Sequence, residues 1–169
     1  MADAQAHWMA PVTAVCVTAW PGAAAALATR LDAAFGLAPA APGCWTAAGA
    51  LVCVWLGPDR WQIEHPGAPD LARQLADAVG ELGGVIEVTD ARAVLCVTGT
   101  GSREVLARLL PLDLHPRAFG PGRAAASIAA HVSVYVRQID AAPTWQIACP
   151  RGYAESLAHA VASAGAVLR

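Results

Sequence analysis

Ala-Val-Cys-Val-Thr (14–18) and Leu-Cys-Val-Thr (95–98) are two copies of one apolar segment, and this repeat decides the fold that we expect. Each copy is followed by a turn and then by apolar residues at helical spacing. Trp-Gln-Ile (61–63) recurs as Trp-Gln-Ile (145–147) at a similar offset of roughly 80 residues. A proline, a helical stretch and a closing valine follow each Trp-Gln-Ile segment, and the second of these valines is Val167. The chain therefore contains two related halves.

Each half is predicted to follow the order β-α-β-β-α-β, the ferredoxin-like or split βαβ arrangement. We expect an α+β fold of two such repeats packed together, with a mainly antiparallel sheet. We expect residues 12–88 and 89–169 to be the two halves of one compact unit, and residues 1–11 to be a loose N-terminal lead-in. Apolar periodicity predicts strands at 12–20, 50–56, 60–65, 85–88, 93–98, 126–130, 132–138 and 144–149, and helices at 23–35, 70–82, 103–110 and 152–164. Residues 37–49 are predicted to form a loop.

Pro-Leu-Asp-Leu-His-Pro-Arg-Ala-Phe-Gly-Pro-Gly-Arg (111–123) is the least alanine-rich part of the sequence. Pro111 and Pro116 restrict the residues before them to extended conformations, so the backbone is stiff. Gly-Pro-Gly (120–122) predicts a turn. A rigid loop that carries charges and an aromatic ring can present side chains in fixed directions at low entropic cost. The simpler interpretation is a braced connection whose Asp and Arg serve neighbouring helix ends.

This loop and its surroundings resemble the gamma subunit family of heterotetrameric sarcosine oxidase. The resemblance rests on Thr-Asp-Ala-Arg-Ala-Val-Leu-Cys-Val-Thr-Gly (89–99), Arg-Glu-Val-Leu-Ala (103–107) and the loop 111–123, in that order. Trp-Leu-Gly-Pro-Asp-Arg-Trp (55–61) is similar to a second signature of the family. The family is also similar in fold to the folate-binding part of the glycine-cleavage aminomethyltransferase, which agrees with the two halves.

The resemblance implies a non-catalytic subunit that braces the flavin-bearing subunit of a cytoplasmic complex. That complex would demethylate sarcosine to glycine, with tetrahydrofolate and oxygen as acceptors. Larger flavin-bearing and folate/NAD-binding subunits would be the partners, and they would hold FAD, FMN, NAD, zinc and tetrahydrofolate, so that no cofactor belongs to this chain. We expect the contact with them to use five loop residues: Asp113, His115, Arg117, Phe119 and Arg123. Arginine suits bidentate contacts with carboxylates, and a phenylalanine can serve as an apolar anchor.

Composition agrees with a protein surface that another protein covers. Charged residues make up 14% of the 169 residues, against about 25% in typical domains. The net charge is −2, so no basic field exists to hold nucleic acid. The apolar runs are shorter than the roughly 20 residues of a membrane span, so we expect no membrane partner. The 5 cysteines show no metal-like spacing, and buried thiols are the expected interpretation for Cys16, Cys53, Cys96 and Cys149.

Few residues suit catalysis. Asp113 beside His115 could make a general base, but the pair can equally satisfy backbone groups of its own loop. Gly-Thr-Gly-Ser (99–102) could cradle an anion, but a tight turn with Ser102 as helix N-cap is the better interpretation. Trp61 and Trp145 occupy equivalent positions in the two halves, which predicts core packing, while Trp8 and Trp45 are candidates for contacts.

Three alternatives stay open at this point. The parent complex could act on another N-methyl amino acid, as an N-methylglutamate-type dehydrogenase does. The chain could be a stand-alone folate-dependent protein of the aminomethyltransferase type. It could also be a regulatory module that binds a small molecule, because paired ferredoxin-like halves often bind ligands.

Overall fold

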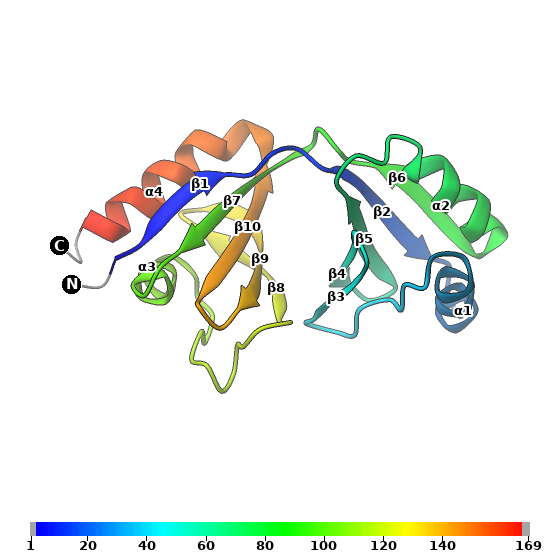
Figure 1. The fold of residues 1–169 in the computed structure, drawn as a ribbon, viewed down its shortest axis with the longest axis horizontal. Helices are drawn as coiled ribbons and strands as arrows, with labels where there is room; N and C mark the ends of the chain where they lie inside the picture. Colours follow the sequence, from blue (N-terminus) through cyan, green and yellow to red (C-terminus); the bar gives the residue numbers. More distant parts are fainter. Residues whose placement is uncertain (1–2, 167–169) are drawn as a thin grey trace. The chain divides into compact units, whose positions relative to one another are not determined.

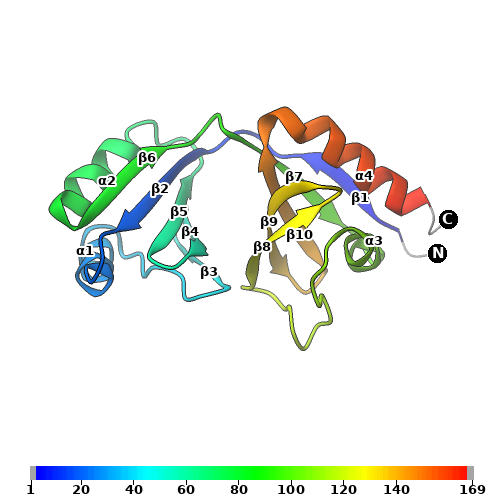
Figure 2. The same ribbon diagram turned by 180° about the vertical axis from the view of Figure 1, so that it is seen from behind.

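The computed structural model describes residues 3–166 (Figure 1). The chain divides into two compact units, Pro11–Thr89 and the combination of Asp90–Arg169 with Met1–Ala10. Each unit consists of one antiparallel five-stranded sheet and two α-helices (Figures 1 and 2). The α+β class expected from the sequence is therefore confirmed, and each sheet has one strand more than the order β-α-β-β-α-β predicts.

The unit Pro11–Thr89 follows the expected order with one added strand. Its elements are β2 (Thr13–Ala19), α1 (Ala24–Phe35), β3 (Trp45–Ala48), β4 (Leu51–Gly57), β5 (Arg60–His65), α2 (Leu71–Val79), the 3-10 turn η1 (Gly80–Leu82) and β6 (Gly83–Glu87). The sheet order is β3-β4-β5-β2-β6. The strand β3 was expected to be loop, and Trp45 in fact pairs with Val54 of β4.

The other unit repeats this plan with one strand taken from the N-terminus. Its elements are β7 (Arg92–Thr98), α3 (Ser102–Leu109), β8 (Ala124–Ala129), β9 (Val132–Asp140), β10 (Thr144–Pro150), the 3-10 turn η2 (Arg151–Tyr153), α4 (Ala154–Ala166) and β1 (Gln5–Trp8). The sheet order is β1-β7-β10-β9-β8, so β1 occupies the place that β6 has in the first unit. The closing valine predicted at Val167 lies outside the described residues.

The N-terminal segment is thus a strand and not the loose lead-in that we expected. Residues Gln5–Trp8 pair with Leu95–Thr98 in antiparallel register. The bond from the Met9 N–H to the Val94 oxygen, 2.9 Å long, continues this ladder. Gly99 permits the start of β1 to come close, because a Cβ on Gly99 would collide with the carbonyl oxygen of Asp3. Gly99 also has a φ of +97°, which other residues rarely adopt.

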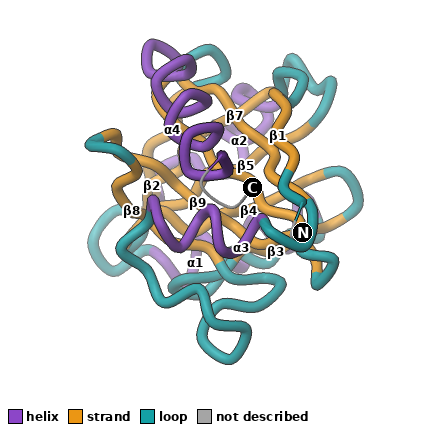
Figure 3. The backbone as a smooth tube through the Cα atoms, turned by 90° about the vertical axis from the view of Figure 1, so that its left-hand side faces the viewer, coloured by secondary structure: helices purple, strands orange, loops and turns teal. Residues whose placement is uncertain are grey.

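Both helices of each unit cover the same face of its sheet. In the unit Pro11–Thr89, Val15 and Val17 of β2 share a buried cluster with Leu27 and Leu31 of α1. Figure 3 looks onto the helices of the other unit, where α3 and α4 lie side by side over the strands. The helix α1 ends at Gly36, which has a φ of 60° and donates its N–H to Asp32. This is the glycine stop that the sequence predicted.

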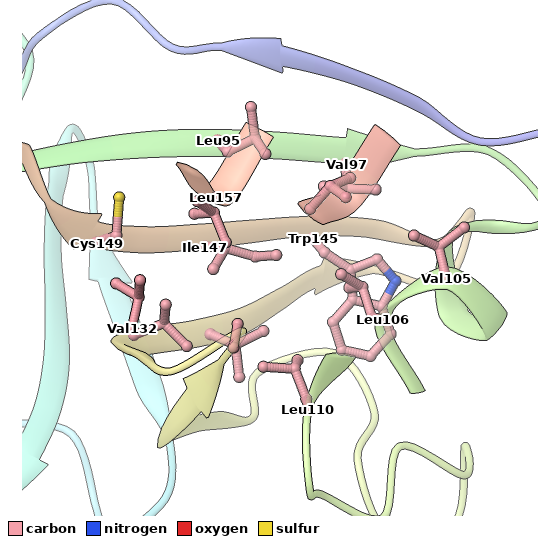
Figure 4. Packing of buried hydrophobic residues seen from close by; sticks show 14 of the residues in the cluster. Leu95, Val97, Val105, Leu106, Leu110, Val132, Trp145, Ile147, Cys149 and Leu157 are labelled. Carbon is pink, nitrogen blue, oxygen red and sulfur yellow. The ribbon is translucent and has the colours of Figure 1, made fainter. Parts of the chain in front are cut away.

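The core of the second unit is built around Trp145, which has no exposed surface (Figure 4). Figure 4 shows Trp145 beside Val105 and Leu106 of α3, with Ile147 on the same face of β10. Trp61, the equivalent tryptophan of the first unit, is 8% exposed and donates its indole N–H to the Ala40 oxygen at 2.9 Å. The core positions predicted for both tryptophans are confirmed.

Candidate interaction site

The segment 111–123 connects α3 to β8 without regular structure, and it projects below these elements in Figures 1 and 2. Leu110, which precedes Pro111, has an extended backbone with φ −109° and ψ 127°, as predicted. The Arg123 N–H donates to the Gly120 oxygen at 3.1 Å, which closes a four-residue turn. Pro121 and Gly122, whose φ is 84°, occupy the central positions of this turn, as in a type II turn.

Arg103 of α3 fixes the backbone of this loop. Its guanidinium donates to the carbonyl oxygens of Leu114 and Phe119, the latter at 3.2 Å. A further N–H donates to Oε1 of Gln138 at 3.2 Å. Burial of the group lowers the pKa of Arg103 from its ordinary value. The planar fork of arginine donors allows one side chain to hold two points of the loop and one strand.

Arg103 also packs against an aromatic ring of the core. The Arg103 guanidinium carbon lies 4.8 Å from the centroid of the Trp145 ring, in cation–π geometry. Sequence reasoning missed Arg103 as part of the site. Its position in the Arg-Glu-Val-Leu-Ala segment of the family resemblance was the only signal.

Gln138 extends this network into β9. Its side chain is 1% exposed, and its Nε2 donates to the backbone carbonyl oxygen of Asp140 at 2.8 Å. The Asp140 carboxylate then accepts the N–H groups of Ala142 and Thr144, each at 2.9 Å. These bonds, chiefly that from Ala142, hold the pKa of Asp140 below its usual value. A continuous set of polar contacts therefore joins the loop to the turn between β9 and β10.

Phe119, which we expected to be an apolar anchor for a partner, is a core residue of its own unit. Its side chain is 6% exposed, and its ring centroid lies 5.6 Å from that of Trp145. Leu114 is similarly buried, at 3%. Leu114 and Phe119 thus belong to the buried cluster that contains Trp145 and do not face outward.

Asp113 and His115 satisfy backbone groups of the loop. Oδ1 of Asp113 accepts the N–H of His115 at 2.9 Å. Nδ1 of His115 accepts the N–H of Arg117 at 3.2 Å. The Asp113 carboxylate is hydrogen-bonded to the loop backbone, and Asp113 and His115 do not form the acid–base pair that we considered.

The exposed polar and charged residues of the loop are Asp113, His115, Arg117 and Arg123. Four of the five expected contact residues thus lie at the surface, on a backbone held by Arg103. We call this set the loop rim. It offers one carboxylate, one imidazole and two guanidinium groups on this backbone, an arrangement that suits polar contacts with another protein.

The turn before α3 does not form the N-cap that we expected. Gly101 occupies the cap position, and Ser102 donates its hydroxyl to the Pro143 oxygen at 3.2 Å. The Gly101 N–H donates to the Asp3 oxygen at 2.9 Å. This N–H is therefore engaged by the start of β1, which argues against an anion cradle.

The structure also shows where the cysteine thiols lie and whether side chains gather that could bind a metal. Cys16, Cys53, Cys96 and Cys149 are buried, and burial raises the pKa of Cys53 to about 11. Between residues 3 and 166, no group of three His, Cys, Asp or Glu side chains could hold a metal ion. No helix in the same range is long and apolar enough to cross a bilayer.

Of the two tryptophans proposed for contacts, Trp8 is 42% exposed in β1, whereas Trp45 is half-buried in β3.

Comparison with known proteins gives the family of the chain. Residues 19–166 match the model of the sarcosine oxidase, gamma subunit family. The chain belongs to this family. A sarcosine oxidase subunit gamma from Arthrobacter sp is 41% identical over 125 residues, which cover 72% of this chain and 61% of that protein. The chain thus spans less than two thirds of the curated relatives that it matches.

Solved structures extend the likeness to the gamma-family fold. A chain of the heterotetrameric sarcosine oxidase from Corynebacterium sp. U-96 in complex with pyrrole 2-carboxylate has a TM-score of 0.86 and 31% identity. The match covers 96% of this chain and 84% of that one. The glycine cleavage system aminomethyltransferase T from Bartonella henselae shares the fold at a TM-score of 0.70 and 17% identity, over 94% of this chain and 45% of that one. The aminomethyltransferase-like fold expected from the sequence is confirmed.

Proposed function

We propose that this chain is the non-catalytic gamma-type subunit of a heterotetrameric sarcosine oxidase complex and that it braces the flavin-bearing subunit. The observation that carries the proposal is the loop rim on its fixed backbone. Arg103, Leu114 and Phe119 hold that backbone from inside. A preorganised polar surface of this kind loses little entropy on binding.

The proposal assigns the chemistry to other subunits. The complex would convert sarcosine to glycine, with tetrahydrofolate and oxygen as acceptors, in the cytoplasm. FAD, FMN, NAD, zinc and tetrahydrofolate would be held by the larger flavin-bearing and folate/NAD-binding subunits. In support, the one histidine of the loop already accepts a backbone N–H, and Cys53, with its pKa raised to about 11, is a poor nucleophile.

Affinity purification of the tagged chain from its source cells tests this function. We expect larger subunits to elute with it, together with flavin absorbance and oxidation of sarcosine. Release of the tagged chain from that complex should leave it colourless and inactive. Elution of the chain alone, or a flavin spectrum that stays with the isolated chain, would contradict the proposal. Oxidation of a different N-methyl amino acid by the complex would change the substrate and keep the bracing role.

A second measurement separates this function from the two alternatives in which the chain acts alone. The isolated chain is titrated with tetrahydrofolate and with free amino acids in a calorimeter. We expect no binding in the micromolar range. Tight binding of folate would favour the stand-alone aminomethyltransferase-type protein, and tight binding of an amino acid would favour the regulatory module.

A further inference from the structure

We infer that β1 and α4 form a second docking site, which binds an extended segment of a larger subunit as an added β-strand. This inference rests on the proposed function, because it requires a complex in which such a subunit is present. The site lies within one unit, between the first strand and the last helix of the described chain, which run side by side in Figures 1 and 3.

The edge of β1 offers unpaired backbone groups. β1 is the terminal strand of its sheet, and all four of its residues are exposed. The backbone of Met9 is hydrogen-bonded to that of Val94 in β7. In an antiparallel ladder every second residue is hydrogen-bonded to the same neighbouring strand, so His7 is hydrogen-bonded to Cys96. The N–H and C=O groups of Ala6 and Trp8 therefore point away from β7, toward the open edge. An added strand is the partner that satisfies such a row.

A groove lies directly beside this edge. Its volume is about 1000 Å³, and it reaches down to Val97 and Val105 of the core. Its α4 wall includes the small residues Ala158, Ala162 and Gly165 together with Val161, and its β1 wall includes Ala6. The helix α2 of the other unit instead carries Leu71, Leu75 and Val79, all buried against its own sheet. The small residues Ala158, Ala162 and Gly165 of α4 leave room for this groove, and alternate apolar side chains of an added strand fit it.

Charge at one end of the groove selects the occupant. Asp3 lines that end, and Gly165 and Ala166, at the C-terminal end of α4, line it as well. The Asp3 carboxylate favours a cation beside it. The bound segment should therefore be apolar at alternate positions and carry Arg or Lys beside Asp3. A second copy of β1 does not fit this description, because Ala4–Trp8 contains no Arg or Lys.

Hydrogen exchange in the isolated chain and in the purified complex tests the added strand. We expect the amides of Ala6 and Trp8 to exchange at least about 100-fold more slowly in the complex, because only there are they hydrogen-bonded. The amide of His7, already in the ladder with β7, should change little. Equal exchange of Ala6 and Trp8 in both samples would overturn the inference. Protection that appears in the isolated chain on raising its concentration would assign the edge to a second copy and would overturn it too.

Substitutions test the groove without relying on exchange. Ala6→Pro removes one outward N–H, and Ala162→Leu fills the groove; each should raise the Kd for the complex lacking this chain by about tenfold. Ser163→Leu adds the same side chain at an exposed α4 position outside the groove and should leave the Kd unchanged. If all three variants bind like wild type, this inference fails and the proposed function stands. If the wild-type chain itself never assembles, both fail.

Discussion

Arg103 is the residue on which the geometry of the loop 111–123 depends. Replacing it by methionine keeps the length of the side chain but leaves the Leu114 and Phe119 oxygens and the Gln138 amide without their donor. We expect Arg103→Met to lower the free energy of unfolding by about 3 kcal/mol, measured by urea denaturation. Arg108→Met, at an exposed position of the same helix, should change it by less than about 0.5 kcal/mol. Equal effects of the two variants would show that Arg103 does not brace the loop.

Phe119 and Arg117 lie close in sequence but differ in burial, and their substitution should separate stability from binding. Phe119→Ala removes a ring that is 6% exposed and packed on Trp145, so we expect a loss of about 3 kcal/mol in unfolding free energy. Arg117→Ala should cost less than about 0.5 kcal/mol, because the side chain is exposed. Thermal or urea unfolding measures both. A loss below 1 kcal/mol for Phe119→Ala would contradict its place in the core.

Cys53 should make stability fall at alkaline pH. Burial raises the pKa of this thiol from 9.0 to about 11, so the folded chain keeps the proton more strongly than the unfolded chain does. The resulting stabilisation is complete below pH 9 and is lost as the pH rises toward 11. Cys53→Ser should reduce this part of the pH dependence in unfolding measurements between pH 8 and 11. An unchanged slope in the variant would assign the alkaline loss to other groups.

Residue by residue, the sequence predicted the loop better than its support. The prolines and glycines of 111–123 reveal a stiff segment because they restrict their own backbone and that of their neighbours. No sequence pattern indicates that Arg103 contacts the loop, since an arginine in the first turn of a helix is usually solvated. Phe119 was placed wrongly for a related reason: a lone aromatic residue between polar neighbours gives no sign of which side of the loop meets the core.

At the scale of elements, the strands β1 and β3 were missed, while the long elements were found. Both missed strands are four residues long, too short for an alternation to stand out. They are strands because β7 and β4 pair with them, and the residues of β7 and β4 lie outside the short segments themselves. That β1 occupies the place equivalent to β6 could likewise not be inferred, because a repeat in the sequence does not say which segment fills each place in a sheet.

Glycine substitutions test how β1 is held on β7. Gly99→Ala introduces a Cβ that collides with the Asp3 oxygen at a φ of +97°, so the start of β1 must move away. Gly36→Ala meets no atom within 4 Å and is strained only by its φ of +60°, so it should cost about 1 kcal/mol in unfolding free energy. We expect Gly99→Ala to cost more and to speed amide exchange at Gln5 and His7. Slow exchange there in Gly99→Ala would show that β1 tolerates the displacement.

At the scale of the whole molecule, the fold and the family could be predicted from the sequence, because the signals for both are spread over many positions. The repeat of 14–18 at 95–98 indicated two related halves, and the motif segments kept their order along the chain. Partner contacts are different in kind. They depend on which side chains stay at the surface once the core is filled, and this is why four of five expected loop residues form the loop rim and the fifth does not.

Charge reversal on the loop rim tests assembly in the intact complex. Arg117→Glu should raise the Kd for the larger subunits by at least about tenfold, because an arginine that meets a carboxylate then becomes a like charge. The wild-type affinity should also fall with added salt, and the variant should respond less. Arg60→Glu makes the same change of charge at an exposed position in the other unit and should bind like wild type. Because Arg117 lies outside the core, the melting temperature of both variants should stay near that of wild type. Unchanged binding of Arg117→Glu, with Arg60→Glu as the matched reference, would remove this arginine from the interface and leave the loop as a structural connection.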